Sequence, residues 1–415
     1  MTIRGLTRRF VILRALRWLP LGLVFPFLVI TPQARGLSLG EIGAVFAVHS
    51  AVAIVLEVPS GALADLVGRR RVLLGGAGLT AVSLLIFAGA QSVPVFMGSV
   101  GLLAAGRALI SGSLEAWYVD SLRVLDPAAP LNHGLSRGSA AEAIGMAVGS
   151  VVGGALVSIA GAGAGAFAGY GVAALAGAVA AVAYLAAIAL LVDERTARAR
   201  RPSRTQPVAS RVREIFATAR DELVGSTTVR VVVITGVALG MTFTAVELLW
   251  QPRLADLLGD EDAHGVSFGA LAAASMLSAA LGAWLSQRVR GGFGLRSGYL
   301  LGLMIGAVCV VLLGLPASAI GFVVLYLLAY LSVGLTDPLH FELLNDAVGP
   351  TARATLISAE ALATQAGALA ANLGVGALAS THGPGTAWAI AGFLLSLTVV
   401  AVAAPLYRTA RTARA

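Results

Sequence analysis

Residues 61–76 read GALADLVGRRRVLLGG, and they place Asp65 and three consecutive arginines between two strongly apolar segments. This concentration of charge is unusual for the chain, because only 12% of its 415 residues are charged and 58% are hydrophobic. A soluble protein carries about 25% charged residues. With a mean hydropathy of +0.87, the chain is predicted to face lipid over most of its surface, with this charged stretch at an edge of the membrane.

Long apolar runs recur along the whole chain. A helix needs about 20 apolar residues to cross roughly 30 Å of hydrocarbon. Twelve runs of this kind lie between glycine, proline and charged residues, which predicts an all-α integral membrane protein with twelve transmembrane helices. The predicted spans are residues 10–31, 40–62, 72–90, 94–120, 138–160, 168–191, 230–251, 266–286, 297–315, 319–342, 355–379 and 385–406.

All 29 basic residues are arginines, and most of them cluster in every second connection between spans. This bias is typical of loops on the cytoplasmic side of a membrane. It predicts a multi-pass protein of the cell membrane with both termini in the cytoplasm, and contact with anionic lipid rather than with nucleic acid. The clusters are Arg4, Arg8 and Arg9; Arg69 to Arg71; Arg123 and Arg137; Arg195 to Arg230; Arg288, Arg290 and Arg296; Arg353; and Arg408, Arg411 and Arg414.

The longest polar stretch, residues 193–229, divides the predicted helices into two sets of six. We therefore predict an N-terminal six-helix bundle over 1–192, a basic cytoplasmic linker over 193–229 and a C-terminal six-helix bundle over 230–415. Within the linker, residues 208–223 could form an amphipathic helix on the membrane surface or a solvated segment.

An internal repeat supports this division. Segments of the first half, with their acidic residues, have counterparts at similar places in the second half. Two parallel halves of six helices, related by pseudo-symmetry about an axis normal to the membrane, are typical of one large class of secondary transporter. The paired segments are GSLEAWYVD (112–120) with GLTDPLHFE (334–342), SAAEA (139–143) with ISAEA (357–361), and GALADLVGRRR (61–71) with the degraded copy GAWLSQRVRGG (282–292).

The stretch GALADLVGRRR resembles the signature G-x-L-x-D-x-x-G-R-R/K between the second and third helices of the major facilitator superfamily (MFS). The matching positions are Gly61, Leu63, Asp65, Gly68, Arg69 and Arg70. The resemblance implies an MFS fold in which Asp65 interacts with the start of the eleventh helix and Arg69 with Asp120. Such contacts would form a conformational latch that opens and closes with the cytoplasmic side. The arginines would also fix the topology of the chain.

The fifth predicted helix carries a row of glycines, Gly145, Gly149, Gly153 and Gly154. The row resembles the signature G-x-x-x-G-P-x-x-G-G of exporters in the same superfamily, with Ser150 in place of the proline. Glycines four residues apart also form a groove into which any neighbouring helix can pack closely. The row therefore indicates either an exporter or close helix packing.

Arg107 lies within the fourth predicted span, where an ionised group is costly unless it faces the bundle interior and has a partner. At 100° per residue, Glu115 lies near the same helix face as Arg107, whereas Asp120 lies almost opposite. We therefore predict that Glu115 shares the interior with Arg107, and that Asp120 belongs to the latch.

Several other acids lie within predicted spans, where they could bind and release protons or hydrogen-bond to a neighbouring helix. The candidates for substrate binding or proton coupling are Glu57, Arg107, Glu115, Glu142, Glu247, Asp337, Glu342 and Glu360. Among them Glu57 is favoured, because it lies just before the latch stretch and next to a proline. His49 and His340 are interpreted as packed or cavity-lining residues rather than as coupling sites.

The sequence lacks phosphate-binding loops, nucleophile elbows and paired metal ligands, so we expect neither an enzyme, a metal site nor a cofactor. Transport would then draw on a proton gradient. The resemblance implies a monomeric, proton-coupled antiporter that exports amphipathic or drug-like small molecules by alternating access. The alternatives are a proton symporter that imports a small metabolite, and a membrane sensor or scaffold without transport activity.

Overall fold

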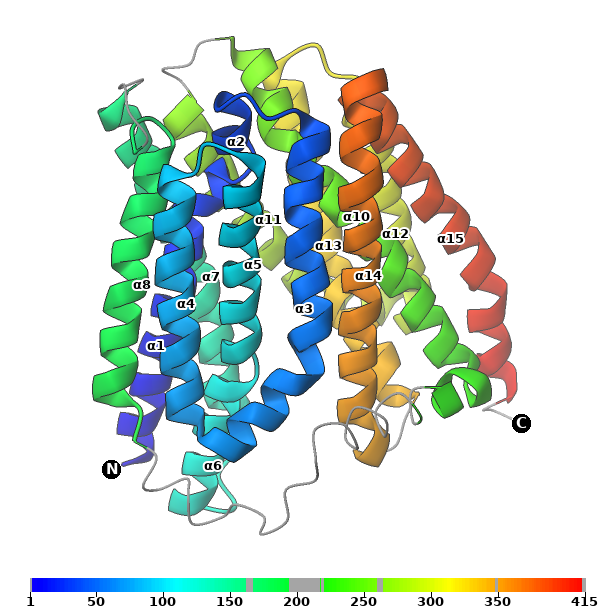
Figure 1. Ribbon diagram of the computed structural model, residues 1–415. Coiled ribbons are helices and arrows are strands. Elements are labelled where there is room, and N and C mark those ends of the chain that lie inside the picture. The colour runs from blue at the N-terminus through cyan, green and yellow to red at the C-terminus, as the bar shows by residue number, and fades with distance from the viewer. Residues whose placement is uncertain are drawn as a thin grey trace. The chain divides into compact units, whose positions relative to one another are not determined.

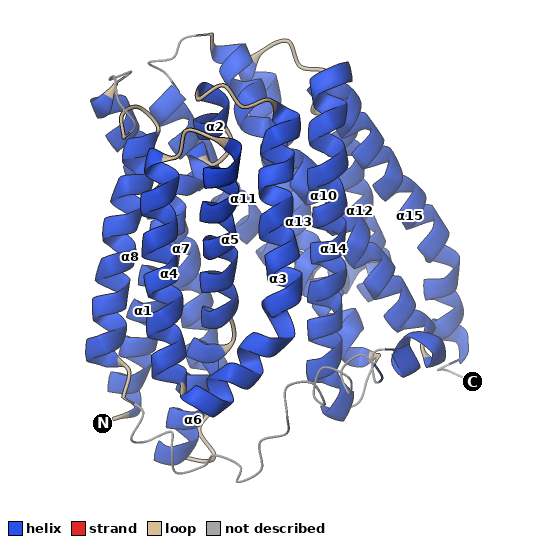
Figure 2. Ribbon diagram, viewed as in Figure 1, coloured by secondary structure: helices blue, strands red, loops and turns tan. Residues whose placement is uncertain are grey.

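The structure is a computed structural model that describes residues 2–161, 167–193, 217, 220–259, 264–347 and 350–412. These residues form helices joined by short loops (Figures 1 and 2). The helices are α1 (Ile3–Val24), η1 (Phe25–Phe27), α2 (Ile30–Ala34), α3 (Leu39–Val67), α4 (Arg69–Gly89), α5 (Val93–Ile110), α6 (Ser113–Leu125), α7 (Asn132–Ala160), α8 (Gly171–Leu191), α10 (Thr227–Leu258), α11 (His264–Phe293), α12 (Leu295–Leu312), α13 (Ala319–Asp346), α14 (Pro350–His382) and α15 (Pro384–Thr412).

The described residues include twelve segments that are long and apolar enough to cross a membrane, which confirms the predicted number of spans. Several helices continue further than the hydropathy pattern predicts. For example, α11 runs to Phe293 and includes Arg288 and Arg290, because a charged residue ends the apolar run without ending the helix. Most of the linker segment 208–223 lies outside the described residues.

The chain divides into two compact units, and we describe each by itself. Unit 1 comprises Met1–Gly36, Val55–Val208 and Asp260–Ala273, and unit 2 comprises Leu37–Ile54, Ala209–Gly259 and Ala274–Ala415. The first half of α3 thus belongs to unit 2, and the start of α11 belongs to unit 1. The contiguous bundles expected from the sequence remain a prediction.

The same packing pattern occurs in both units. In unit 1, α1 packs against α7 and α8, and α4 packs against α5 and α8. In unit 2, α10 packs against α14 and α15, and α12 packs against α13 and α15. These pairings match helix for helix when the second half of the chain is aligned with the first, as the internal repeat leads one to expect.

Each unit has its own apolar core of fully buried side chains. The core of unit 1 is centred on Phe10, Leu13, Leu114 and Trp117. The core of unit 2 is centred on aliphatic residues of α10, α12, α13 and α15 together with Tyr299. These cores hold the helices that carry the charged side chains described below.

The glycine row of α7 lies against the backbones of two other helices. A Cβ atom at Gly149 would lie 2.6 Å from the Leu19 carbonyl oxygen of α1, and one at Gly154 would lie 2.6 Å from the Gly265 carbonyl oxygen of α11. Ser150 is buried and donates to the carbonyl oxygens of Met146 and Gly22. The row therefore allows backbone-to-backbone packing of α7 on both neighbours.

This packing makes Gly149 sensitive to a single added methyl group. Because backbone atoms of α1 cannot rotate away, Gly149→Ala is expected to lower the free energy of unfolding by about 1–3 kcal/mol. The matched control is Gly98→Ala in α5, where a Cβ atom would meet nothing within 4 Å and alanine is expected to be neutral or to stabilise the helix by about 0.5–1 kcal/mol. Thermal unfolding of the purified variants measures both effects, and equal melting temperatures would contradict the prediction.

Candidate functional site

Arg14 on α1 lies between two glutamates from other helices of unit 1. Its guanidinium forms ion pairs with Glu115 on α6 and with Glu142 on α7. Arg14 is only 8% exposed, so one buried cation is shared by two carboxylates. Ion pairs with charged hydrogen bonds of this kind are strong and directional. The sequence did not predict that Arg14 pairs with Glu115 and Glu142.

The predicted pairing of Glu115 with Arg107 is wrong, because the helix that carries both is broken between them. Helix α5 ends at Ile110 and α6 begins at Ser113. At Gly112 the backbone is left-handed, with φ of +69°, a conformation that glycine adopts without strain. The angle of 100° per residue applies only along a continuous helix, so the break turns Glu115 away from Arg107 and towards Arg14.

Arg107 instead lies in a cavity of unit 1 beside Trp18. The cavity is lined by Arg17, Trp18, Thr80, Arg107 and Tyr184, among others. The Arg107 guanidinium lies 5.6 Å from the centre of the Trp18 ring, and that of Arg17 lies 5.8 Å from it. Both distances are typical of cation–π contacts. The cavity thus holds two guanidinium groups around one indole.

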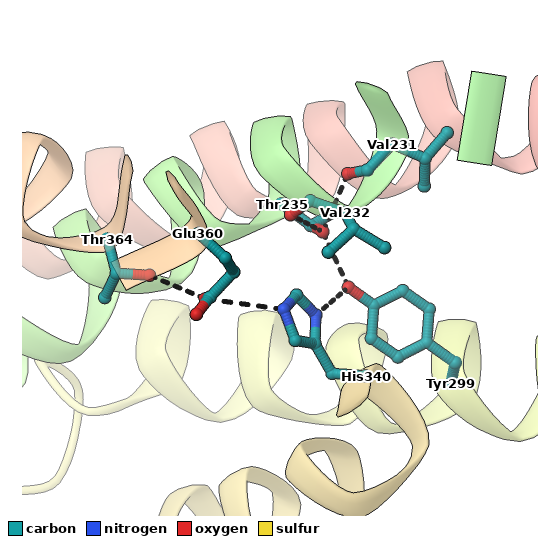
Figure 3. Close-up of polar contacts among 7 residues, drawn as sticks. All are labelled: Val231, Val232, Thr235, Tyr299, His340, Glu360 and Thr364. Atoms are coloured by element: carbon teal, nitrogen blue, oxygen red, sulfur yellow. Dashed lines mark hydrogen bonds and ion pairs between the residues drawn. The ribbon is translucent and has the colours of Figure 1, made fainter. Parts of the chain in front are cut away.

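A second polar network lies in unit 2 and is centred on His340 of α13 (Figure 3). The Nδ1 atom of His340 lies 2.9 Å from the Tyr299 hydroxyl, and Nε2 lies 3.4 Å from the Glu360 carboxylate. Tyr299 in turn donates to the Thr235 hydroxyl at 2.6 Å. The network joins α10, α12, α13 and α14, and the His340 side chain is buried.

The direction of these hydrogen bonds determines where His340 carries its proton. Thr235 donates to the carbonyl oxygens of Val231 and Val232, so its oxygen accepts from Tyr299. Because the Tyr299 proton is used in that bond, the Tyr299 oxygen accepts from His340, and Nδ1 must be protonated. Nε2 of His340 then faces the Glu360 carboxylate in one of two ways. Either both atoms are acceptors, or a proton lies between Nε2 and the carboxylate oxygen. Two buried acceptors in contact are unfavourable, and Nε2 has no hydrogen-bond partner among the described residues, so this contact is a place where one proton would be stabilising.

Two further acids of unit 2 lie near or within polar networks. Asp337 lies one helical turn before His340 on α13 and interacts electrostatically with His340 and Glu360. Glu247 on α10 accepts hydrogen bonds from three aromatic side chains, those of Trp250, Tyr326 and Tyr330. These three donors satisfy the Glu247 carboxylate, whereas the Glu360 carboxylate lies against the imidazole of His340.

The two networks occupy equivalent places in the internal repeat. In the aligned segments, Glu115 corresponds to Asp337 and Glu142 corresponds to Glu360. In unit 1 the two acids are held by Arg14, and in unit 2 the corresponding acids lie around His340. A pair of acids is therefore found in both halves, next to a permanent cation in one half and a histidine in the other.

The latch residues occupy a second pair of equivalent places. Arg69 lies 3.0 Å from Asp120 in unit 1, as the family resemblance implies. In unit 2, Arg290 forms an ion pair with Glu342, so Glu342 lies in this pair and not in the His340 network. Arg70 donates to the Ala189 carbonyl oxygen at 2.7 Å, at the end of α8. Gly61 has open space around it, and Gly68 has a φ of +112° immediately before α4.

Two candidates contribute less to the geometry. The Asp65 side chain lies outside the described residues, so its predicted contact remains a prediction. The Glu57 side chain is partly buried in α3, where the backbone carbonyl of Glu57 accepts a hydrogen bond from Ser60. Among the described residues no ion pair to Glu57 is present.

The sequence matches the profile described as Major Facilitator Superfamily over residues 10–359. Together with the twelve spans, this match shows that the chain belongs to the major facilitator superfamily and is a multi-pass membrane protein of the secondary-transporter class. A transport protein rather than an enzyme is thereby indicated. No curated protein matches the sequence.

Solved structures of several transporters share the fold. A variant of the nucleoside transporter NupG has a TM-score of 0.80 at 13% identity, covering 96% of this chain and 99% of that chain. A bacterial homologue of the human drug peptide transporters has a TM-score of 0.74 at 12% identity, covering 99% and 100%. An inward-facing, unoccupied bacterial homologue of the human lysosomal transporter Spinster has a TM-score of 0.73 at 15% identity, covering 99% and 97%.

Proposed function

We propose that the protein is a proton symporter for a small polar metabolite, and that the coupled proton binds between His340 and Glu360. The observation that carries this proposal is the hydrogen-bond chain through Tyr299 and Thr235, which leaves Nε2 of His340 facing the Glu360 carboxylate. Histidine titrates near physiological pH, and a buried carboxylate beside it can share the proton. Loss of that proton leaves two acceptors in contact and favours a rearrangement of α13 against α14.

The equivalent site in unit 1 is not suited to proton exchange. Arg14 retains its charge at every physiological pH, and its guanidinium forms ion pairs with both Glu115 and Glu142. We therefore assign proton binding to unit 2 and a structural charge balance to the Arg14 cluster. This assignment places the coupling acid at Glu360 and gives Glu57 no direct part in it.

A polar substrate is favoured by the two arginines of the unit 1 cavity, whose other lining residues include Trp18, Leu21 and Ile110. The guanidinium groups of Arg17 and Arg107 lie there, and solved structures with the same fold include nucleoside and peptide transporters. The exporter prediction rested on the α7 glycine row, and packing of that row against α1 and α11 accounts for it without reference to direction. Uptake by symport therefore takes the place of export as the favoured function.

The sign of a substrate-induced pH change tests symport against antiport. Purified protein in proteoliposomes, with no imposed gradient and an external pH dye, would receive a panel of nucleosides, dipeptides, monocarboxylates and lipophilic cations. Symport predicts that an added substrate makes the external medium more alkaline, because protons enter with it. Acidification on addition of a lipophilic cation would establish drug antiport, and no response to any compound would favour the sensor alternative. Empty liposomes give the control for passive permeation.

A further inference from the structure

The cavity of unit 1 is lined by hydrogen-bond donors that have no acceptor among the described residues. The indole nitrogen of Trp18 and the hydroxyl of Tyr184 are both buried and without a hydrogen-bond partner there. Arg17 and Arg107 likewise make no hydrogen bond or ion pair within the described part of the chain, although both lie near Glu142 electrostatically. Since native structures satisfy nearly all buried donors, this cavity lacks an acceptor.

The local charge balance also indicates that this cavity lacks an acceptor. Arg14, Arg17 and Arg107 lie around the two carboxylates of Glu115 and Glu142, and their mutual electrostatic interactions join them into one group. Three permanent cations against two acids leave one positive charge in excess. An uncompensated charge at membrane depth is costly, so a species with a single negative charge would complete this group.

The arrangement of the two free arginines matches a planar anion. Each guanidinium lies against the Trp18 ring, at 5.6 Å for Arg107 and 5.8 Å for Arg17, and both arginines line the cavity. Contact with an aromatic ring leaves the N–H groups of a guanidinium available to a carboxylate, which they bind through two parallel hydrogen bonds. The Trp18 N–H and Tyr184 O–H add two neutral donors.

We propose that the transported metabolite is a monocarboxylate, and that its carboxylate binds Arg107 and Arg17 beside Trp18 and Tyr184. This proposal rests on the proposed function and names the substrate class for it. A single carboxylate neutralises the excess charge, whereas a phosphate monoester, which carries nearly two charges at neutral pH, would reverse it. Lipophilic cations would be repelled from the cavity.

Ligand binding to the purified protein tests this proposal without any gradient. The melting temperature in detergent would be measured with acetate, lactate and benzoate, and with acetamide, lactamide and benzamide as neutral counterparts at equal ionic strength. At least one carboxylate is expected to raise the melting temperature saturably while its amide does not. In Arg107→Gln the affinity for that carboxylate is expected to fall by about ten- to a hundredfold, because a charge-assisted bidentate contact is lost.

A second readout does not depend on which ligand is chosen. Because Arg107 has no acidic partner in direct contact, Arg107→Gln is expected to raise the melting temperature of the ligand-free protein. The charge-matched control is Arg230→Gln, which alters an exposed arginine that donates to Thr227 at the start of its own helix and to the Leu223 and Val224 carbonyl oxygens just before it. The proposal is overturned if the carboxylates stabilise wild type no better than the amides, or if they stabilise Arg107→Gln equally well. Binding of carboxylates without proton movement would overturn the proposed function alone.

Discussion

Arg14→Gln is expected to lower the free energy of unfolding by about 3 kcal/mol and to abolish transport. The substitution leaves Glu115 and Glu142 without their shared cation, and removal of one partner from a buried ion pair costs about 3–5 kcal/mol. The lower end of that range applies because the Glu115 side chain is 39% exposed and that of Glu142 is 24% exposed. Chemical or thermal unfolding of the purified variant measures the loss.

A double-mutant cycle separates the loss of charge compensation from the loss of packing. In Arg14→Gln/Glu142→Gln one of the two unpaired acids is removed, so part of the lost stability is expected to return. The same Glu142→Gln substitution on the wild-type background is expected to destabilise. If Arg14→Gln alone is as stable as wild type, the Arg14 cluster does not hold α1, α6 and α7 together.

Glu360→Gln is expected to reduce proton-coupled uptake by about a hundredfold or more, the scale on which a positioned acid or base contributes to proton transfer. The amide of glutamine can donate to Nε2 of His340 and so replace the shared proton permanently. Exchange of labelled against unlabelled substrate across the membrane needs no net proton movement and is expected to persist. Uptake driven by a pH gradient and exchange without one are measured on the same proteoliposomes.

Glu247→Gln is the matched control for that experiment. It makes the same change in the same unit, at a carboxylate that accepts hydrogen bonds from Trp250, Tyr326 and Tyr330. We expect it to lower stability while uptake remains dependent on the pH gradient. If Glu247→Gln uncouples transport and Glu360→Gln does not, the proton is carried by Glu247 and the proposed site is wrong.

The membrane spans could be predicted because hydropathy is a property of single segments, and the number of spans is confirmed. The break at Gly112 could not be predicted in the same way. The chain contains 50 glycines, and most of them sit within helices, so glycine alone does not mark a helix end. Gly112 has a positive φ, and the predicted pairing of Glu115 with Arg107, which assumed a continuous fourth helix, failed with it.

The acids of the site were visible in the sequence, but their partners were not. Glu115, Glu142, Asp337 and Glu360 are unusual in apolar segments and could be identified from that fact alone. Which basic side chain lies beside these acids depends on the rotation of α1, which carries Arg14, and of α13, which carries His340. The spacing Asp337-x-x-His340 puts both side chains on one helix face, and this signal could have marked His340 as a site residue.

The unequal charge of the two units has an electrical consequence for transport. In the proposed cycle, unit 1 has one positive charge in excess when Arg14, Arg17 and Arg107 are counted against two acids, and unit 2 takes up a proton between His340 and Glu360. A monocarboxylate that fills the first site and one proton that fills the second would cross together as a neutral pair. The membrane voltage would then do no work on the transport cycle, and accumulation would be limited by the pH difference alone, at about tenfold for each pH unit.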